Sequence, residues 1–273
     1  MITIEILNNL IQMDLKFEKE FSNAYKYIKE GNPDYYIESE FIDEVKPYGE
    51  LVSNTTYFDT YKIDGGTLQI QRTLEGNVIG SIKYLGNRII LSMIDKSFVT
   101  EYLLSQYAMV YIISKENALL MHGSSFVYND IAIILTAPSG TGKSTHSRLW
   151  QKYENVTVLN DDKNILNIED NKIVLYPSPW SGKHHLDNNI KAELKAIVFL
   201  YQNKENVIER LKPMAAFRLL VKQLEVPSIE NKDRWSNMVD KLLELPIYHL
   251  GCNMEKEAYL TLKNKLEEDL YAN

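Results

Sequence analysis

The chain has 273 residues, of which 45% are hydrophobic and 25% charged, a composition typical of a soluble globular protein with one large domain or two small ones. Its formal net charge of -7 argues against a general nucleic-acid binder, because such proteins usually carry a basic excess. A single cysteine, Cys252, excludes an intrachain disulfide framework and a four-cysteine zinc site.

The cellular location follows from what the sequence lacks. The first residues do not show the basic-then-apolar order of a signal peptide. The apolar runs, such as residues 131–135, are too short to span a bilayer. We therefore expect a cytoplasmic protein that binds neither membrane nor nucleic acid.

The chain from about residue 36 to 95 has the pattern of short strands, several of them rich in tyrosine. Asp64-Gly65-Gly66 and Gly86-Asn87 stand between such runs as turn signals. The expected strands cover residues 35–41, 57–63, 67–72, 78–84 and 88–93. A helix should follow over about 97–115, where apolar and aromatic residues recur at helical spacing.

After residue 118 compact apolar runs alternate with helical patterns, which favours an α/β domain. The expected strands cover residues 119–123, 131–136, 156–160, 172–176, 196–201 and 246–250. The expected helices begin near Lys143 and cover 214–224, 231–244 and 255–270. We divide the chain into a β-rich N-terminal part, residues 1–117, and an α/β part, residues 118–273, although the boundary lies anywhere from about 96 to 117.

The sharpest motif is Ala137-Pro138-Ser139-Gly140-Thr141-Gly142-Lys143-Ser144-Thr145, which follows an expected strand and precedes a helix, as a phosphate-binding loop does. The two glycines let backbone N–H groups turn toward phosphate oxygens. Lys143 adds a positive charge for the β- and γ-phosphates, and Ser144 offers a hydroxyl to Mg²⁺. The motif usually opens with glycine, and Ala137 stands there instead. A glycine-rich turn without a ligand is the alternative, but strand, loop and helix in this order favour a nucleotide.

Asp161 and Asp162 come directly after the strand expected over 156–160. One carboxylate can hold Mg²⁺ and the other can accept a proton from an attacking hydroxyl. A polar turn is the alternative, and the nearby phosphate-binding loop makes it the weaker one. His122 ends an earlier strand; a single histidine is more often structural, and the sequence alone does not place it near Asp161.

The loop after residue 176 carries Trp180, Ser181, Gly182 and Lys183, followed by His184-His185. In one interpretation this loop forms a wall of the active site, on the acceptor or the nucleotide side. In the other, Trp180 packs in the protein core and the other residues of the loop are solvated. The sequence leaves these two interpretations open. Zinc is disfavoured, because adjacent histidines in an extended loop point apart and no third ligand is evident.

Together these residues resemble the kinase domain of HPr kinase/phosphorylase, and more closely the HPr-kinase-like serine kinases of bacterial peptide-modification gene clusters. The resemblance rests on His122-Gly123, the loop from Ala137 continued by His146, Asn160-Asp161-Asp162, and Pro179-Trp180-Ser181-Gly182-Lys183. Phosphoenolpyruvate carboxykinase is similar at a greater distance. The match covers about residues 119–250 and leaves out the N-terminal part.

The resemblance implies a phosphate-loop kinase fold and phosphoryl transfer from ATP, or another phosphate donor, to a serine hydroxyl with Mg²⁺. It implies that residues from Ser139 to Thr145 cradle phosphate. Asp161 would be the base, assisted by His122. Asp162 would be a carboxylate that binds the metal ion or orients the reacting groups. The acceptor would be a peptide, a protein or free serine. That family often forms rings, so a homo-oligomer is one option, but no motif of this sequence specifies the oligomeric state. Thr145, where HPr kinase has glutamate, argues against HPr itself as the substrate and against reverse phosphorolysis.

Two other functions stay open at this point. A nucleoside triphosphatase or nucleotide-binding regulator needs the same phosphate cradle, so the sequence separates it poorly from a kinase. An interaction protein with a degenerate loop is disfavoured by the intact Lys143-Ser144 and Asp161-Asp162.

Overall fold

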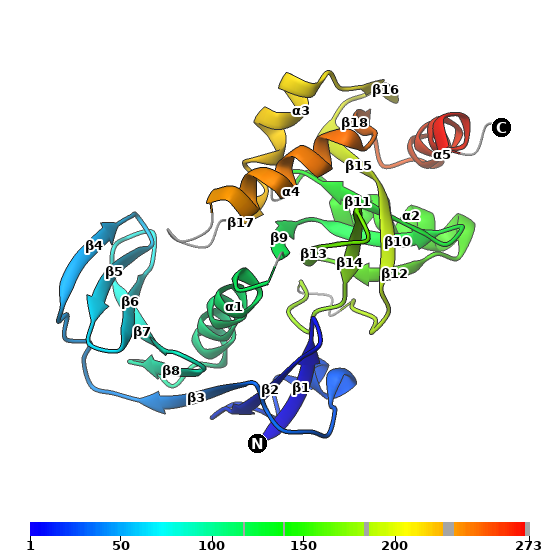
Figure 1. Ribbon diagram of the computed structural model, residues 1–273. Helices are drawn as coiled ribbons and strands as arrows, with labels where there is room; N and C mark the ends of the chain where they lie inside the picture. The colour runs from blue at the N-terminus through cyan, green and yellow to red at the C-terminus, as the bar shows by residue number, and fades with distance from the viewer. Residues whose placement is uncertain (117, 139, 183–185, 226–231, 271–273) are drawn as a thin grey trace. The chain divides into compact units, whose positions relative to one another are not determined.

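The computed structural model describes residues 1–116, 118–138, 140–182, 186–225 and 232–270. The chain divides into two compact units, unit 1 from Met1 to Ile112 and unit 2 from Ile113 to Asn273. Each unit is built on its own β-sheet, so the protein is a mixed α/β protein with a β-rich N-terminal part (Figure 1). Among the described residues, no helix combines the length and apolar character needed to cross a membrane.

Unit 1 contains an eight-stranded sheet in the order β1-β2-β3-β8-β7-β6-β5-β4. Its strands are β1 (Ile2–Ile6), β2 (Asn9–Asp14), β3 (Tyr35–Phe41), β4 (Glu50–Asn54), β5 (Phe58–Ile63), β6 (Gly66–Arg72), β7 (Val78–Leu85) and β8 (Arg88–Met93). The expected meander is confirmed in β5 to β8, and Gly65 and Gly86 take the positive φ values of 72° and 65° that their tight turns require. The hairpin of β1 and β2 was not predicted from the sequence.

The helix expected over 97–115 is α1 (Phe98–Ser114), and a short 3₁₀ helix, η1 (Ser22–Tyr27), follows β2. A Cβ built on Gly80 of β7 would lie 2.5 Å from Ser92 O of β8 and 3.1 Å from Leu104 Cδ1 of α1, so glycine leaves room for both the neighbouring strand and the helix. Glu101 of α1 is 1% exposed, and its carboxylate accepts backbone hydrogen bonds from Lys16 N at 2.7 Å and Phe17 N at 2.9 Å. A buried carboxylate is tolerated there because N–H donors replace its water.

The described residues of unit 2 form a larger sheet and four helices, which include the strands and helices expected from the sequence. The strands are β9 (Ala118–His122), β10 (Ser124–Tyr128), β11 (Ile131–Thr136), β12 (Thr157–Asn160), β13 (Lys163–Glu169), β14 (Lys172–Tyr176), β15 (Ala192–Gln202), β16 (Val207–Arg210), β17 (Leu224–Glu225) and β18 (Ile247–Cys252). The helices are α2 (Lys143–Glu154), α3 (Pro213–Leu220), α4 (Lys232–Glu244) and α5 (Lys256–Leu270).

The strand pairing brings the carboxyl ends of four strands to one edge of this sheet. β15 pairs in parallel with β11 on one side and with β18 on the other. β10 pairs antiparallel with both β11 and β12, so β12 runs in the same direction as β11. Open α/β sheets bind ligands at the carboxyl ends of their strands. The loop after β11, which the sequence predicts to bind phosphate, and the acidic pair after β12 therefore lie at the same edge.

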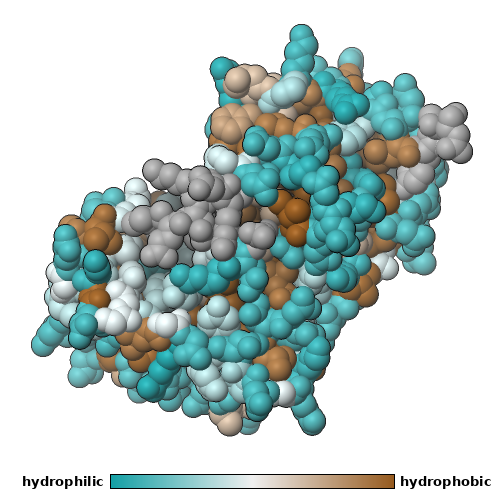
Figure 2. Space-filling model, viewed as in Figure 1, coloured by the Kyte–Doolittle hydropathy of each residue, from teal (hydrophilic) through white to brown (hydrophobic). Residues whose placement is uncertain are grey.

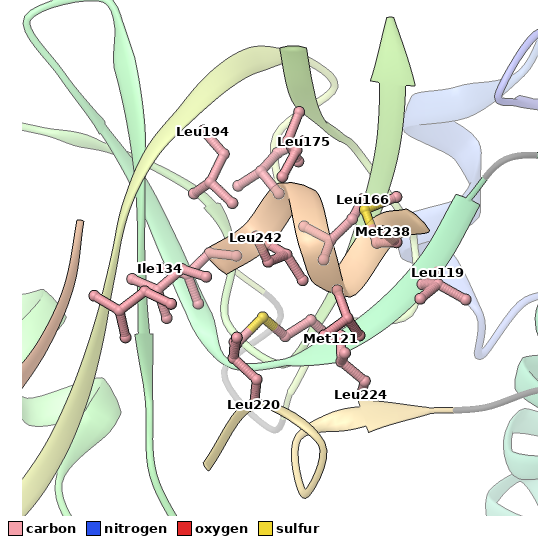
Figure 3. Packing of buried hydrophobic residues seen from close by; sticks show 14 of the residues in the cluster. Leu119, Met121, Ile134, Leu166, Leu175, Leu194, Leu220, Leu224, Met238 and Leu242 are labelled. Atoms are coloured by element: carbon pink, nitrogen blue, oxygen red, sulfur yellow. The ribbon is translucent and has the colours of Figure 1, made fainter. Parts of the chain in front are cut away.

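Helices cover both faces of the sheet, which is why the central strands are continuous apolar runs rather than alternating ones. Ile134 and Ile197 belong to the cluster beneath α3 and α4, whereas Ile133 and Val198 belong to the cluster beneath α2 and α5. Figure 3 shows the first cluster, in which Leu242 of α4 lies among leucines of the strands. On the face drawn in Figure 2, exposed hydrophobic residues form small groups between hydrophilic ones.

His146 of α2 is 2% exposed, and burial lowers the pKa of its imidazole to about 4, against a smaller opposing effect of the Ala258 backbone. The unfolded chain takes up this proton near pH 6.5, so between pH 6.5 and 4 it binds more protons than the folded protein. We expect His146 to lower the free energy of unfolding by up to about 1.4 kcal/mol for each pH unit of acidification in that window.

Urea titrations at pH 7.5 and 5.0, followed by tryptophan fluorescence, would measure this for the wild type and His146→Phe. The variant should lose less stability on acidification, because contributions from other groups cancel in the difference. Equal losses in both proteins would contradict the prediction.

Candidate active site

The phosphate-binding loop leaves the end of β11 and enters α2 at Lys143. Gly140 and Gly142 have φ values of 79° and 114°, in the left-handed region that L side chains rarely adopt. A Cβ on either glycine would meet no atom within 4 Å, so the backbone conformation, and not crowding, calls for glycine. The two glycines therefore turn the backbone as the sequence predicts, and phosphate binding by this loop stays a prediction. Ser139 lies outside the described residues.

Lys143, the first residue of α2, is hydrogen-bonded back to the start of this loop. Its Nζ donates a hydrogen bond to Ala137 O at 2.8 Å, and Thr141 Oγ1 donates to Pro138 O at 2.8 Å. Burial lowers the pKa of the Lys143 ammonium, and the negative charge of Asp162 partly opposes this. A desolvated cation at a helix N-terminus attracts an anion strongly, and a phosphate group would relieve its loss of water.

Three strand ends converge beside Lys143. Thr136 Oγ1, at the end of β11, donates to His122 O at 2.8 Å, and Gly123 N donates to Asp162 O at 2.9 Å. A Cβ on Gly123 would lie 2.8 Å from Ile134 Cγ2 and 2.9 Å from Leu135 O, so only glycine lets the chain cross from β9 to β10 this close to β11. These contacts bring His122 to the acidic pair, a proximity that the sequence alone did not provide.

His122 contacts Asp162 rather than Asp161. Its Nδ1 lies 2.8 Å from Asp162 Oδ1, and both side chains keep about a third of their surface exposed, at 32% and 27%. Burial alone would raise the pKa of Asp162, but the His122 hydrogen bond and the charges of Lys163 and Lys143 lower it below its ordinary value. Asp162 is therefore an ionised, accessible carboxylate with a histidine beside it and the loop lysine within electrostatic reach.

Asp161 has a different environment. Its residue is 7% exposed, and its Oδ1 accepts a hydrogen bond from Gly182 N at 2.6 Å. A Cβ on Gly182 would lie 3.1 to 3.2 Å from three atoms of the Asp161 carboxyl group, so glycine permits this close approach. The two neighbouring carboxylates thus have different contacts: Asp161 joins the acidic turn to the loop that carries Gly182, and Asp162 faces His122.

Asn160 is a site residue to which sequence reasoning gave no role. It is 1% exposed; its Oδ1 accepts from Asp162 N at 2.8 Å and Lys163 N at 2.7 Å, while its Nδ2 donates to Ser178 O at 3.0 Å and Trp180 O at 3.2 Å. Asparagine at a strand end favours such a side-chain turn, and this was the available signal. Asn160 sets the direction of the acidic turn. It also holds to that turn the loop after β14, residues 177–187, which we call the Trp180 loop.

The Trp180 loop runs back along β12. Asp161 N donates to Leu186 O at 3.1 Å, and Ser181, itself 5% exposed, donates from Oγ to Asp187 Oδ1 at 3.3 Å. Trp180 has no exposed surface, so its side chain is packed as the second sequence interpretation expects. The loop nevertheless returns to the acidic pair, as the first interpretation requires. Lys183, His184 and His185 lie outside the described residues.

The candidate metal ligands are Ser144, Asp161 and Asp162. Within the described part of the chain, no group of three His, Cys, Asp or Glu side chains is arranged to hold a metal ion. Mg²⁺ needs fewer protein ligands, because it keeps several waters and takes oxygens from substrate phosphates. The donor set, a hydroxyl and an accessible carboxylate next to a phosphate-binding loop, suits Mg²⁺, with Asp162 better placed than the buried Asp161.

Comparisons with known proteins add little to this geometry. No protein-family model matches the chain, and no curated protein matches it. Among solved structures, the HPr(Ser) kinase/phosphatase from Coxiella burnetii is similar at 14% sequence identity and a TM-score of 0.35, over 56% of this chain and 99% of that one. An overlap this weak assigns no family, so the function has to be inferred from the site.

Proposed function

We propose that unit 2 is a phosphate-loop kinase domain of the HPr kinase type, which transfers the terminal phosphoryl group of a nucleoside triphosphate to a serine hydroxyl. The observation that carries this proposal is the His122–Asp162 pair, at 2.8 Å, beside a phosphate-binding loop whose lysine interacts electrostatically with Asp162. A hydrolase needs the same phosphate-binding loop. A carboxylate–histidine pair beside that loop suits the removal of a proton from a bound hydroxyl, which a kinase requires.

The roles follow from the contacts. Backbone N–H groups of residues 140–145 and the Lys143 ammonium would hold the β- and γ-phosphates. Asp162 would take the proton from the serine Oγ as that oxygen bonds to the γ-phosphorus, and the bond to the bridging oxygen would break to release a nucleoside diphosphate. Ser144 would hold Mg²⁺ directly and Asp162 would hold it through a water molecule, so that a carboxylate oxygen of Asp162 stays available for the serine proton; the ion would supply charge neutralisation when bound.

Our assignment differs from the one that the sequence resemblance implies. There Asp161 is the base, but its carboxylate is buried and occupied by Gly182 N. We therefore assign the base to Asp162, with His122 orienting its carboxylate. Because the pKa of Asp162 is held low, it is a weak base, and its contribution would come from position more than from basicity.

The nature of the acceptor rests on the sequence resemblance. A serine in a peptide, a protein or the free amino acid fits it, and the Ser181-Gly182 stretch of the Trp180 loop would form a wall of the acceptor site. The alternative is a nucleoside triphosphatase that uses water. Incubation with Mg²⁺-ATP and serine-bearing peptides, followed by mass spectrometry, separates the two, since release of inorganic phosphate alone would favour the hydrolase.

Binding of the nucleotide can be tested at Lys143. Replacing Lys143 by Ala should weaken Mg²⁺-ATP binding about 10- to 150-fold, because a charge-assisted hydrogen bond contributes about 1.5–3 kcal/mol. Isothermal titration would measure it, with Lys152→Ala as a matched control at the exposed far end of the same helix. Undiminished affinity in Lys143→Ala would contradict the proposed cradle.

A further inference from the structure

The reacting groups occupy one side of the phosphate-binding loop. His122 stands two residues before β10 and Asp162 two residues after β12; β10 neighbours β11 on that side of the sheet, and β12 lies next to β10. Phosphoryl transfer places the attacking and leaving oxygens on opposite sides of phosphorus. If the acceptor comes from the β12 side, the rest of the donor must extend the other way, across the carboxyl ends of β15 and β18.

An aromatic pair lies along that path. Thr136, the last residue of β11, pairs with Phe199 of β15, and β15 continues past it through Tyr201. Neighbouring strands are about 4.8 Å apart, so β15, which carries Tyr201, and β18, which carries His249, lie about 5 and 10 Å from β11 across the sheet. A ribose and its first phosphate can span that distance. Tyr201 therefore lies where a nucleobase would arrive.

The structure makes room for Tyr201 to lie flat. Tyr201 pairs with Gly251 of β18, and a Cβ on Gly251 would lie 2.5 Å from Tyr201 Cζ and 2.6 Å from its hydroxyl. The Tyr201 ring also contacts the His249 ring, with centroids 4.3 Å apart and planes tilted by 38°. Glycine thus lets the phenol rest on the strand, while Tyr201 keeps 36% of its surface exposed.

The loops that follow these strands are fastened to each other. Asn203 N donates to Cys252 O at 3.1 Å, Asn206 Nδ2 donates to Asn253 Oδ1 at 3.2 Å, and Asn253 N donates to Asn206 Oδ1 at 3.1 Å. These paired amides hold the two loops together at the end of the sheet. An exposed ring next to a fixed polar rim is the arrangement of a stacking site, with one apolar surface and hydrogen-bonding groups at its border.

We infer that the Tyr201–His249 pair is the platform on which the nucleobase of the phosphoryl donor stacks. The inference rests on the proposed function, because it needs a nucleotide in the loop. It makes the donor a nucleoside triphosphate rather than pyrophosphate, which has no base to stack.

The test compares ATP with inorganic tripolyphosphate, which carries the phosphates without the base. Isothermal titration with Mg²⁺ would give both affinities for the wild type, Tyr201→Ala, Tyr201→Phe and His249→Ala. Tyr36→Ala serves as control, because Tyr36 is another exposed strand tyrosine, at 39%, in unit 1. We expect Tyr201→Ala to bind ATP about 5- to 150-fold more weakly and tripolyphosphate unchanged, as loss of base stacking does.

Tyr201→Phe should keep most of the ATP affinity, and His249→Ala should lose part of it, again with tripolyphosphate unaffected. Unchanged ATP affinity in Tyr201→Ala would overturn the inference. So would an equal loss of ATP and tripolyphosphate in both alanine variants, because the base would then contribute nothing. A wild-type protein that binds neither ligand would instead contradict the proposed function, and the platform with it.

Discussion

Replacing Asp162 by Asn is expected to lower the rate of phosphoryl transfer about 10²- to 10⁴-fold, the usual cost of losing a general base. The asparagine keeps the size of the side chain and can still accept a hydrogen bond from His122, but it can neither accept the serine proton nor carry the charge that Asp162 presents to Lys143. Nucleotide binding should survive, because the loop backbone and Lys143 remain.

Asp161→Asn is the matched control. Its Oδ1 can still accept the hydrogen bond from Gly182 N, one of the contacts of the buried carboxylate. We therefore expect a much smaller loss of rate than in Asp162→Asn. Single-turnover transfer at saturating Mg²⁺-ATP would compare the two variants. If Asp161→Asn were the inactive one, the roles implied by the sequence resemblance would be right and ours wrong.

The parts of the site that the sequence predicted are the local ones. Gly140, Gly142 and Lys143 stand in one stretch, so the sequence alone predicts the glycine turn that the structure has, while phosphate binding by these residues stays a prediction. The strand before the loop and the helix after it were likewise predicted, because their apolar periodicity is contained within a few residues. Tight turns at Gly65 and Gly86 were predicted for the same reason.

The contacts that order the site are not local, and the sequence could not give them. His122 meets Asp162 because β9 and β13 pair side by side and Gly123 crosses β11 at close range. Asn160 reaches Ser178 and Trp180 only after the loop has folded back along β12. Residue spacing along a chain does not determine such pairings, since strand register is set by the whole sheet.

Some strands were missed for identifiable reasons. β1 and β2 turn through Leu7 and Asn8, both at positive φ, and leucine is not a turn signal. β13 contains the polar residues Asn164 and Asn167, which weaken its apolar pattern, although Asn164 is buried and hydrogen-bonds through its Nδ2 to Gly123 O at 2.7 Å. A buried amide of this kind looks like a loop residue until its partner is known.

Trp180→Ala is expected to lower the free energy of unfolding of unit 2 by about 3–5 kcal/mol, the usual cost of emptying a large buried aromatic site. The side chain has no exposed surface, and the backbone on both sides of it is held, by Ser178 Oγ accepting from Trp180 N at 3.2 Å and by Asn160. Trp180→Phe should cost less, because most of the volume stays filled.

The three tryptophans of the chain, Trp150, Trp180 and Trp235, all lie in unit 2, so tryptophan fluorescence in urea follows this unit alone. Rates of serine transfer and ATP hydrolysis, measured under conditions in which each variant is folded, show whether Trp180 only packs in the core or also shields the phosphoryl group from water. Loss of Trp180 should loosen Gly182 from Asp161 and admit water, so the ratio of transfer to hydrolysis should fall together with stability. A variant as stable as the wild type in which only that ratio falls would show that Trp180 acts as an exposed lid. Lower stability with an unchanged ratio of transfer to hydrolysis would show that the loop is a structural support alone. A loop whose disturbance does not let water compete does not shield the phosphoryl group.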